Sequence, residues 1–259
     1  MKRVVAWLLL ALALGFGCRS QGEKPRLVVS AASSLAEVVA ELKALYESKY
    51  GDVEVVLNLG GSQQLRAQIE RGAPVDVFLS ANVAHVESLA SENRVAEWFV
   101  ASCNSLVVAV PTGNPAGLRR VEDLVRARRI VLGADEVPVG LYAQRLIHNI
   151  QARDGGDFAT TVEAATVSKE LSVRAVRNRV LMKEADAAVI YRSDALAAGA
   201  GLEFIEISDS INVIARYPVA RLEGSANPEA ARRWMELVRS PEGQAVFERF
   251  GFRACEEVE

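Results

Sequence analysis

The sequence has little histidine and lacks the usual nucleophile and phosphate-loop motifs, which argues against an enzyme. Its 259 residues include two histidines, His85 and His148. Both lie among apolar residues at helical spacing, where a packed or surface histidine is more common than a catalytic base. Gly-x-Ser-x-Gly, His-Glu-x-x-His and a Gly-rich loop ending in Lys are absent. We therefore expect a binding protein without a resident cofactor.

An excess of basic charge is also lacking. The chain has 30 Lys and Arg against 33 Asp and Glu, a formal net charge of −3. Nucleic-acid-binding proteins need a basic face, so that class of partner is excluded. An anion bound by this chain must be attracted locally, against the field of the whole molecule. Aromatic residues make up only 6% of a chain that is 50% hydrophobic, so we expect an aliphatic core.

The N-terminal hydrophobic run is too short to span a bilayer. It covers residues 4–14 and follows the basic pair Lys2 and Arg3. A positive segment before a short apolar run predicts a secretory signal peptide, residues 1–17. Its removal would make the net charge more negative.

A cysteine directly follows this predicted signal peptide. Cleavage before Cys18 and lipidation of Cys18 would anchor the protein to a membrane in the cell envelope, with residues 18–25 as a polar tether. Gly15 and Phe16 depart from the usual lipoprotein sequence. An ordinary signal peptide with a bystander cysteine therefore remains the alternative.

Cysteine is otherwise scarce, and the only cysteines besides Cys18 are Cys103 and Cys255. Export permits a disulfide between them. Sequence spacing does not show whether two cysteines meet, so a disulfide and two buried thiols are both open.

Strand-like and helix-like segments alternate along the remaining sequence. The predicted strands cover residues 26–31, 53–59, 75–79, 105–110, 130–133, 187–191, 204–207 and 211–219. Apolar residues at helical spacing follow most of them, and two helices close the chain at 228–238 and 241–250. This alternation predicts an α/β fold of mainly parallel sheets flanked by helices. Ligands in such folds lie at the carboxyl ends of strands, where helices begin.

Five segments at such positions either open a helix or present a hydroxyl group. They are Ala31–Leu35, Gly60–Gln64, Pro138–Tyr142, Leu171–Arg174 and Val189–Asp194. A helix N-terminus offers unpaired N–H groups and about half a positive charge, so four converging termini would supply about two. That charge matches a dianion without any lysine or arginine.

The donors in these segments are hydroxyl and main-chain groups. Ser34 and Ser62 offer hydroxyls, Val139 and Val173 offer N–H groups, and Tyr191 offers a phenol. Such a set suits a fully ionised oxyanion, because hydrogen phosphate carries a proton that needs an acceptor. Taken singly, each residue has an ordinary structural explanation, as a helix cap, a core residue or a tie to the backbone.

Ser34 in particular begins a Ser-x-x-Glu pattern that ends at Glu37. This pattern is typical of a capping box, so we expect Ser34 to cap the helix that follows it.

Six segments together resemble the periplasmic molybdate-binding proteins of ABC transporters, in order and over residues 27–253. They are 31–35, 68–81, 104–108, 137–143, 190–195 and 217–220. The run Gly-Ala-Pro-x-Asp-x-Phe-x-Ser-Ala is shared with wider oxyanion-binding relatives. Val-Pro-x-Gly-x-Tyr-Ala together with Tyr-x-Ser-Asp-Ala is more specific to molybdate binders.

The resemblance implies a two-lobed type II periplasmic-binding-protein fold, with the ligand cleft between the lobes. It implies lobes of residues 26–104 plus 217–259 and 105–216, which close around the ligand. The family's ligand positions fall on five residues here: Ser34, Ser62, Val139, Val173 and Tyr191.

The sequence departs from the family pattern around these positions. Val139 stands where the family often has alanine, and the segment before Val173 is less acidic and less rich in asparagine than usual. Gln63 and Gln64 replace small hydroxyl residues after Ser62. Val173 is therefore the least secure of the five assignments, and the glutamines are expected at the rim of the cleft.

The function that the resemblance implies is capture of molybdate or tungstate and delivery to a permease and ATPase complex in the inner membrane, by a monomeric protein. Tungstate is not separable from molybdate by sequence. A binding protein for sulfate, thiosulfate or a small organic anion is one alternative. A surface protein that binds another protein, with the cleft as a relic, is a second.

Overall fold

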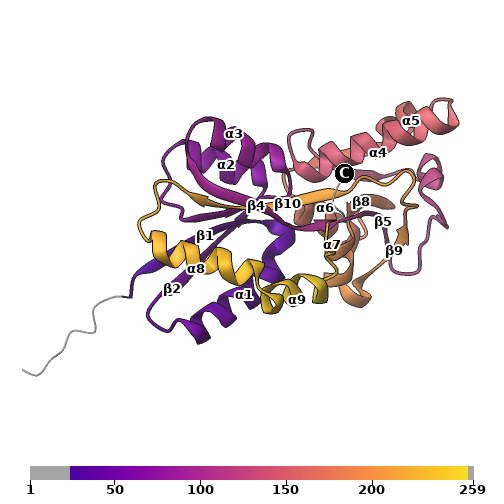
Figure 1. The fold of residues 1–259 in the computed structure, drawn as a ribbon. Coiled ribbons are helices and arrows are strands. Elements are labelled where there is room, and N and C mark those ends of the chain that lie inside the picture. Colours follow the sequence, from indigo (N-terminus) through magenta and orange to yellow (C-terminus); the bar gives the residue numbers. More distant parts are fainter. Residues whose placement is uncertain (1–23, 256–259) are drawn as a thin grey trace, which may run out of the picture.

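The computed structural model describes residues 24–255, and the chain there forms two α/β lobes side by side (Figure 1). Each lobe is built on a five-stranded sheet flanked by helices, which confirms the predicted two-lobed α/β fold. The predicted signal peptide, residues 1–17, and Cys18 lie outside the described residues. Within the described part, no helix is long and apolar enough to cross a bilayer.

Lobe 1 is the sheet with strand order β2-β1-β3-β10-β4 and the helices packed on it. Its strands are β1 (Arg26–Ala32), β2 (Glu54–Gly60), β3 (Val77–Leu79), β4 (Val95–Asn104) and β10 (Ala215–Leu222). Its helices are η1 (Ser33–Leu35), α1 (Ala36–Lys49), α2 (Ser62–Glu70), α3 (Val83–Ser91), α8 (Pro228–Arg239) and α9 (Pro241–Arg249).

Lobe 2 is the sheet with strand order β7-β6-β8-β5-β9 and its helices. Its strands are β5 (Leu106–Pro111), β6 (Ile130–Gly133), β7 (Thr166–Glu170), β8 (Ala187–Tyr191) and β9 (Leu202–Glu206). Its helices are η2 (Val121–Arg126), α4 (Pro138–Asp154), α5 (Phe158–Ala165), α6 (Val173–Leu181), α7 (Arg192–Ala197) and η3 (Gly199–Gly201).

Both sheets are mixed but mainly parallel, as predicted, because four of the five strands in each sheet run in the same direction. In lobe 1, β1 runs parallel to β2 and β3, while β10 runs antiparallel to β3 and β4. In lobe 2, β6 runs parallel to β7 and β8, while β5 runs antiparallel to β8 and β9. In each lobe, the strand opposed to the other four is the one with which the chain enters from the other lobe, β10 in lobe 1 and β5 in lobe 2.

The chain passes between the lobes twice, and the two passages lie side by side. β4 ends at Asn104, which pairs with Ala215 at the start of β10. The side chain of Asn212, on the returning passage, accepts from the N–H of Leu106 and donates to its carbonyl. Both passages are therefore tied together at the junction.

A disulfide joins Cys103 to Cys255, which settles the pairing that the sequence left open. Cys103 lies near the end of β4, and its N–H and carbonyl both pair with Arg253. The C-terminal segment is thereby fixed to the strand that leads into lobe 2.

Candidate functional site

The five predicted site residues come together in one pocket between the lobes. Ser34 and Ser62 come from lobe 1, and Val139, Val173 and Tyr191 come from lobe 2. Each is at most 5% exposed. The rest of the lining consists of Ala32, Ser33, Gly60, Gly61, Ala81, Val137 and Pro138. The pocket is small, with a cavity volume of about 10 Å³.

Both serine hydroxyls accept a hydrogen bond from the protein and keep their own proton free. Ser62 Oγ accepts from the N–H of Ala81 at 3.0 Å. Ser34 Oγ accepts from the Tyr217 hydroxyl at 3.1 Å. A hydroxyl that accepts from the protein in this way directs its proton elsewhere. In this pocket, Ser34 and Ser62 can therefore donate to a bound anion.

Ser34 does not cap α1, so the predicted capping box was wrong. The chain forms the short helix η1 at Ser33–Leu35, and the residue that precedes α1 is Leu35, without a side-chain cap. Tyr217 holds the Ser34 hydroxyl instead, and the carboxylate of Glu37 pairs with Arg174 of lobe 2. Both members of the pattern thus make long-range contacts in place of the local ones.

Val139 and Val173 each stand in the first turn of a helix. Pro138 is the first residue of α4, and Val139 is the second. Val173 is the first residue of α6, after Ser172, whose side chain accepts from the N–H of Ala175. Main-chain N–H groups in a first turn have no acceptor within the helix. They carry partial positive charge, so they can bind an anion without a cationic side chain.

Tyr191 places a buried phenol at the pocket, and its hydroxyl has no hydrogen-bond partner among the described residues. Its ring contacts those of Tyr142 and Tyr217 edge to face. Burial raises the pKa of Tyr191 well above 10, so the hydroxyl is protonated at neutral pH and can donate. An unpartnered buried donor aimed into a donor-lined pocket fits an anionic ligand.

No charged side chain lines this pocket among the described residues. An anion there would meet hydroxyls, a phenol and helix N-termini, with no carboxylate to accept a proton. This is the arrangement that the sequence predicts for a fully ionised oxyanion.

Two further tyrosines support the site, and sequence reasoning did not assign them a role. Tyr217 orients Ser34, and the Tyr142 hydroxyl donates from lobe 2 to the Ala81 carbonyl of lobe 1 at 3.2 Å. Both lie inside the motifs that carry the family resemblance. Their place in these motifs was the signal in the sequence that could have indicated a role at the site. Their hydrogen-bond partners could not be predicted, because they depend on tertiary contacts.

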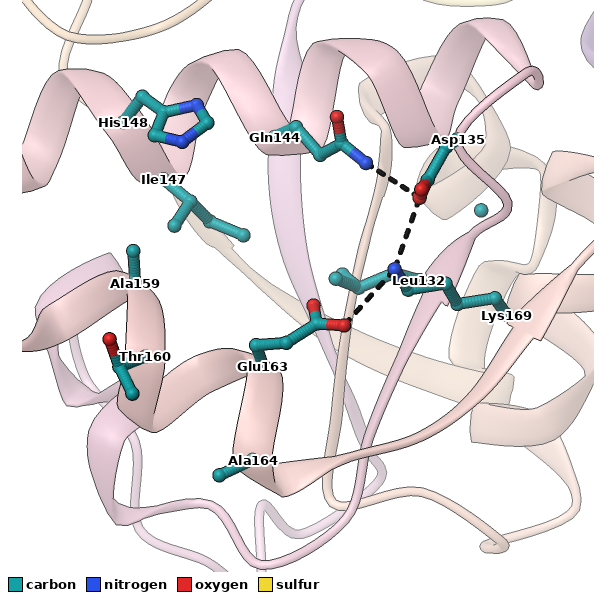
Figure 2. A pocket seen from close by; sticks show the side chains of 11 residues that line it. Leu132, Asp135, Gln144, Ile147, His148, Ala159, Thr160, Glu163, Ala164 and Lys169 are labelled. Carbon is teal, nitrogen blue, oxygen red and sulfur yellow. Dashed lines mark hydrogen bonds and ion pairs between the residues drawn. The ribbon is translucent and has the colours of Figure 1, made fainter.

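A larger hollow of about 640 Å³ lies elsewhere, between α4, α5 and the β6–β7 edge of lobe 2 (Figure 2). Its polar groups pair with one another. Lys169 contacts Asp135 and Glu163 at 3.1 Å, and Gln144 donates to Asp135 at 2.6 Å. These bonds raise the pKa of Lys169 and leave no charged group without a partner to recognise a solute.

Neither histidine lies at the candidate site. His85 is on α3, where burial and the nearby Arg66 lower its pKa to about 4. His148 is an exposed residue of α4 at the larger hollow. Within residues 24–255, no three His, Cys, Asp or Glu side chains are grouped so as to hold a metal ion.

Comparisons with known proteins identify the family of the chain. The family model of the bacterial extracellular solute-binding proteins matches residues 27–253. The molybdate-binding protein ModA of Mycobacterium tuberculosis is 28% identical, over 96% of this chain and 95% of that protein. ModA of Escherichia coli is 26% identical, over 93% of this chain and 94% of that protein.

A solved structure shares the fold. The periplasmic molybdate-binding protein of Azotobacter vinelandii superposes with a TM-score of 0.78, over 89% of this chain and the whole of that chain, at 19% identity. The matching family consists of solute-binding proteins and not of enzymes. With the family model covering most of its length, the chain belongs to the bacterial extracellular solute-binding proteins.

Proposed function

We propose that this protein captures molybdate or tungstate in the pocket between its lobes, for uptake by an ABC importer. The observation that carries the proposal is the donor set. Two serine hydroxyls, an unpartnered buried phenol and the first turns of α4 and α6 meet in a small pocket without a charged side chain. The similarity to molybdate-binding proteins over nearly the whole chain supports this choice of ligand.

The proposed ligands are the hydroxyls of Ser34 and Ser62, the N–H groups of Val139 and Val173, and the Tyr191 hydroxyl. The proposed lobes are residues 26–104 plus 217–259 and residues 105–216. The pairing of Asn104 with Ala215 at the junction supports these limits to within a few residues.

Delivery of the anion requires a permease and ATPase complex in the inner membrane as the partner. The extracellular family supports a location in the periplasm or cell envelope. A lipid anchor on Cys18 and a monomeric state complete the proposal, and both rest on the sequence. Mass spectrometry of the mature N-terminus tests the anchor, since it detects acyl chains on Cys18.

Thermal melts with molybdate, tungstate, sulfate and phosphate test the ligand. An anion at about a hundred times its Kd adds about 2.7 kcal/mol of stability, which raises Tm by about 5 to 10 °C in a chain of this size. We expect that rise with molybdate and tungstate, and none with phosphate. If sulfate raised Tm as much as molybdate does, the pocket would be assigned to oxyanions in general. No rise with any of the four would contradict the proposal.

The double variant Ser34→Ala/Ser62→Ala tests the residues. Each lost hydrogen bond to a charged group costs about 1.5 to 3 kcal/mol, so we expect affinity to fall at least about 100-fold. Ser102→Ala is the matched control, because this buried serine hydroxyl donates to the Arg253 carbonyl, away from the pocket. Calorimetry that shows wild-type affinity in the double variant would remove the assigned site.

A further inference from the structure

The turn that leads from β7 into α6 contacts lobe 1 through Gln63. The Nε2 of Gln63, in the first turn of α2, donates to the Leu171 carbonyl at 3.0 Å. Gly61 lies against the same carbonyl, since a Cβ built on it would be 2.6 Å from the Leu171 oxygen. The two lobes are in direct contact here, next to the pocket.

Arg174, on the other side of Val173 in sequence, makes a second contact with lobe 1. Its Nε donates to the Ser33 carbonyl at 2.7 Å, and its guanidinium pairs with the carboxylate of Glu37. The side chains of Arg174 and Glu37 are 30% and 35% exposed, so this ion pair is half-buried.

Val173 thus lies between two residues that are bonded to the opposite lobe. A main-chain N–H has no rotamer of its own, so its direction is set by the position of the turn that carries it. The hydroxyls of Ser34 and Ser62 are on lobe 1, and the Val173 N–H is on lobe 2. Contacts that fix this turn against lobe 1 therefore set the distance from the Val173 donor to an anion held by the serines.

We propose that Arg174 and Gln63 are positioning residues, which hold the Val173 turn against lobe 1 and so keep the cleft closed on its ligand. The identification of the ligand as an oxyanion rests on the proposed function. Gln63 and the segment before Val173 both depart from the pattern of the molybdate-binding proteins. In this chain, the two departures contact each other.

The contacts join opposite lobes, so they form on closure and break on opening. Loss of one of these contacts should speed release of the ligand, because release requires the lobes to open. Association begins with open lobes and should change little. A residue with a merely structural role would lower the stability without this split between the two rates.

The experiment compares variants of the full mature chain by calorimetry and stopped-flow binding with molybdate. We expect Arg174→Gln and Glu37→Ala each to raise the dissociation rate about tenfold, with association within about twofold of wild type. The double variant should be no worse than Arg174→Gln alone, because the arginine change already removes the pair with Glu37 together with the bond to the Ser33 carbonyl. Gln63→Ala should act in the same direction.

Two comparisons separate positioning from general damage. Arg179→Gln is the matched control, since Arg179 is on the same helix and pairs with Glu170 and Glu184 within lobe 2. The exchange Glu37→Arg/Arg174→Glu should recover part of the lost residence time. Equal dissociation rates in Arg174→Gln and Arg179→Gln would overturn the proposal.

A distance measurement between the lobes does not depend on the identity of the ligand. Spin labels on cysteines introduced at the exposed positions Glu87, in lobe 1, and Arg126, in lobe 2, report closure. We expect Arg174→Gln to reduce the closed population. If it does so while molybdate has no effect on wild type, the positioning role stands and the proposed function fails. A closed population unchanged by Arg174→Gln overturns the positioning role even if molybdate binds.

Discussion

Ser34 and Ser62 owe their orientation to groups that lie outside the pocket or at its edge. The N–H of Ala81 fixes one hydroxyl, and the phenol of Tyr217 fixes the other. A serine hydroxyl rotates freely unless an acceptor or donor holds it. The donor strength of these two serines is therefore a property of their neighbours as much as of the serines themselves.

Replacing Tyr217 with phenylalanine tests this dependence. The change removes the O–H that donates to Ser34 Oγ at 3.1 Å and leaves the ring packing in place. We expect anion affinity to fall about five- to tenfold, because the hydrogen bond that orients the Ser34 hydroxyl is lost. Calorimetry measures the change. Tyr46→Phe is the control, because its buried hydroxyl donates to the Ala230 carbonyl far from the pocket, and it should bind like wild type.

Asp194 lies in α7, directly after β8, and one oxygen of its buried carboxyl group lacks a hydrogen-bond partner among the described residues. Burial raises its pKa to about 7, although Arg177 and Arg174 lower it and Glu37 raises it further. Tyr191 and Tyr217 also lie close enough for their pKa values to be affected by it. The folded protein therefore holds the Asp194 proton more tightly than the unfolded chain does.

This difference makes stability depend on pH in a defined direction. A raised folded-state pKa gives a contribution that is complete below the unfolded value near 3.8 and is lost as pH rises through about 7. Asp194→Asn removes the titration. Between pH 5 and pH 8, we expect wild type to lose stability relative to the variant, by on the order of a few kcal/mol in the free energy of unfolding. The Tm of the variant should therefore rise relative to that of wild type over this range.

Asp186→Asn is the control for this pH series. Burial raises the pKa of Asp186, but the Arg129 guanidinium and the Arg128 N–H outweigh burial and lower it. The contribution of Asp186 to stability is lost only as pH falls through its lowered folded-state pKa. The Tm difference between Asp186→Asn and wild type should therefore stay constant from pH 5 to pH 8. A flat difference for Asp194→Asn as well would show that Asp194 is ionised throughout this range.

At the scale of elements, the site is made by the points where helices begin after strands. Gly140 shows how closely these points are packed. A Cβ on Gly140 would be 2.1 Å from the Ala134 carbonyl oxygen, so only glycine lets the first turn of α4 approach the end of β6. That approach places Val139 at the pocket.

The sequence pattern predicted the buried strands well, because they are short runs of apolar residues. The predicted strands 130–133 and 187–191 match β6 and β8, and both are fully buried in the structure. The longer elements that were missed are β4, β7 and α5, and the short helices η2 and η3 were missed as well. β7 is an edge strand of mixed polar residues, and β4 is half-exposed along most of its length. Neither has an apolar periodicity that would distinguish it from a loop.

The candidate site was predictable from sequence only through the family resemblance. By composition, Val139 and Val173 look like ordinary core residues, since their donors are main-chain groups. The pattern around Ser34 even indicated the wrong role, because a local capping box and a long-range bond to Tyr217 use the same hydroxyl. Which of the two forms depends on the tertiary fold.

At the scale of the whole molecule, the local sequence pattern does not show how the chain passes from one lobe to the other and back. β4 and β10 belong to lobe 1, yet each connects directly to a strand of lobe 2, and Figure 1 shows them leading to the junction. Antiparallel pairing there follows from the return of the chain, which is a long-range property. The alternation of strands and helices thus predicted the class of fold and the mainly parallel sheets, but not the one antiparallel strand in each sheet.

The disulfide acts at this largest scale, because it closes a loop that contains the whole of lobe 2. Cys103 and Cys255 are 152 residues apart in sequence. Closing a loop of this length restricts the unfolded chain, and we expect reduction to cost about 2 to 5 kcal/mol of stability. Thermal melts with and without reductant measure the cost.

The same bond ties the C-terminal segment beside the lobe junction without touching the pocket. Reduced protein should therefore bind anion with near-normal affinity at temperatures below its lowered Tm. The variant Cys103→Ser/Cys255→Ser should melt like the reduced wild type and show no response to reductant. If reduction left the Tm of wild type unchanged, the loop would contribute nothing to stability. If reduction abolished binding in the folded state, the junction would depend on the bond for its geometry.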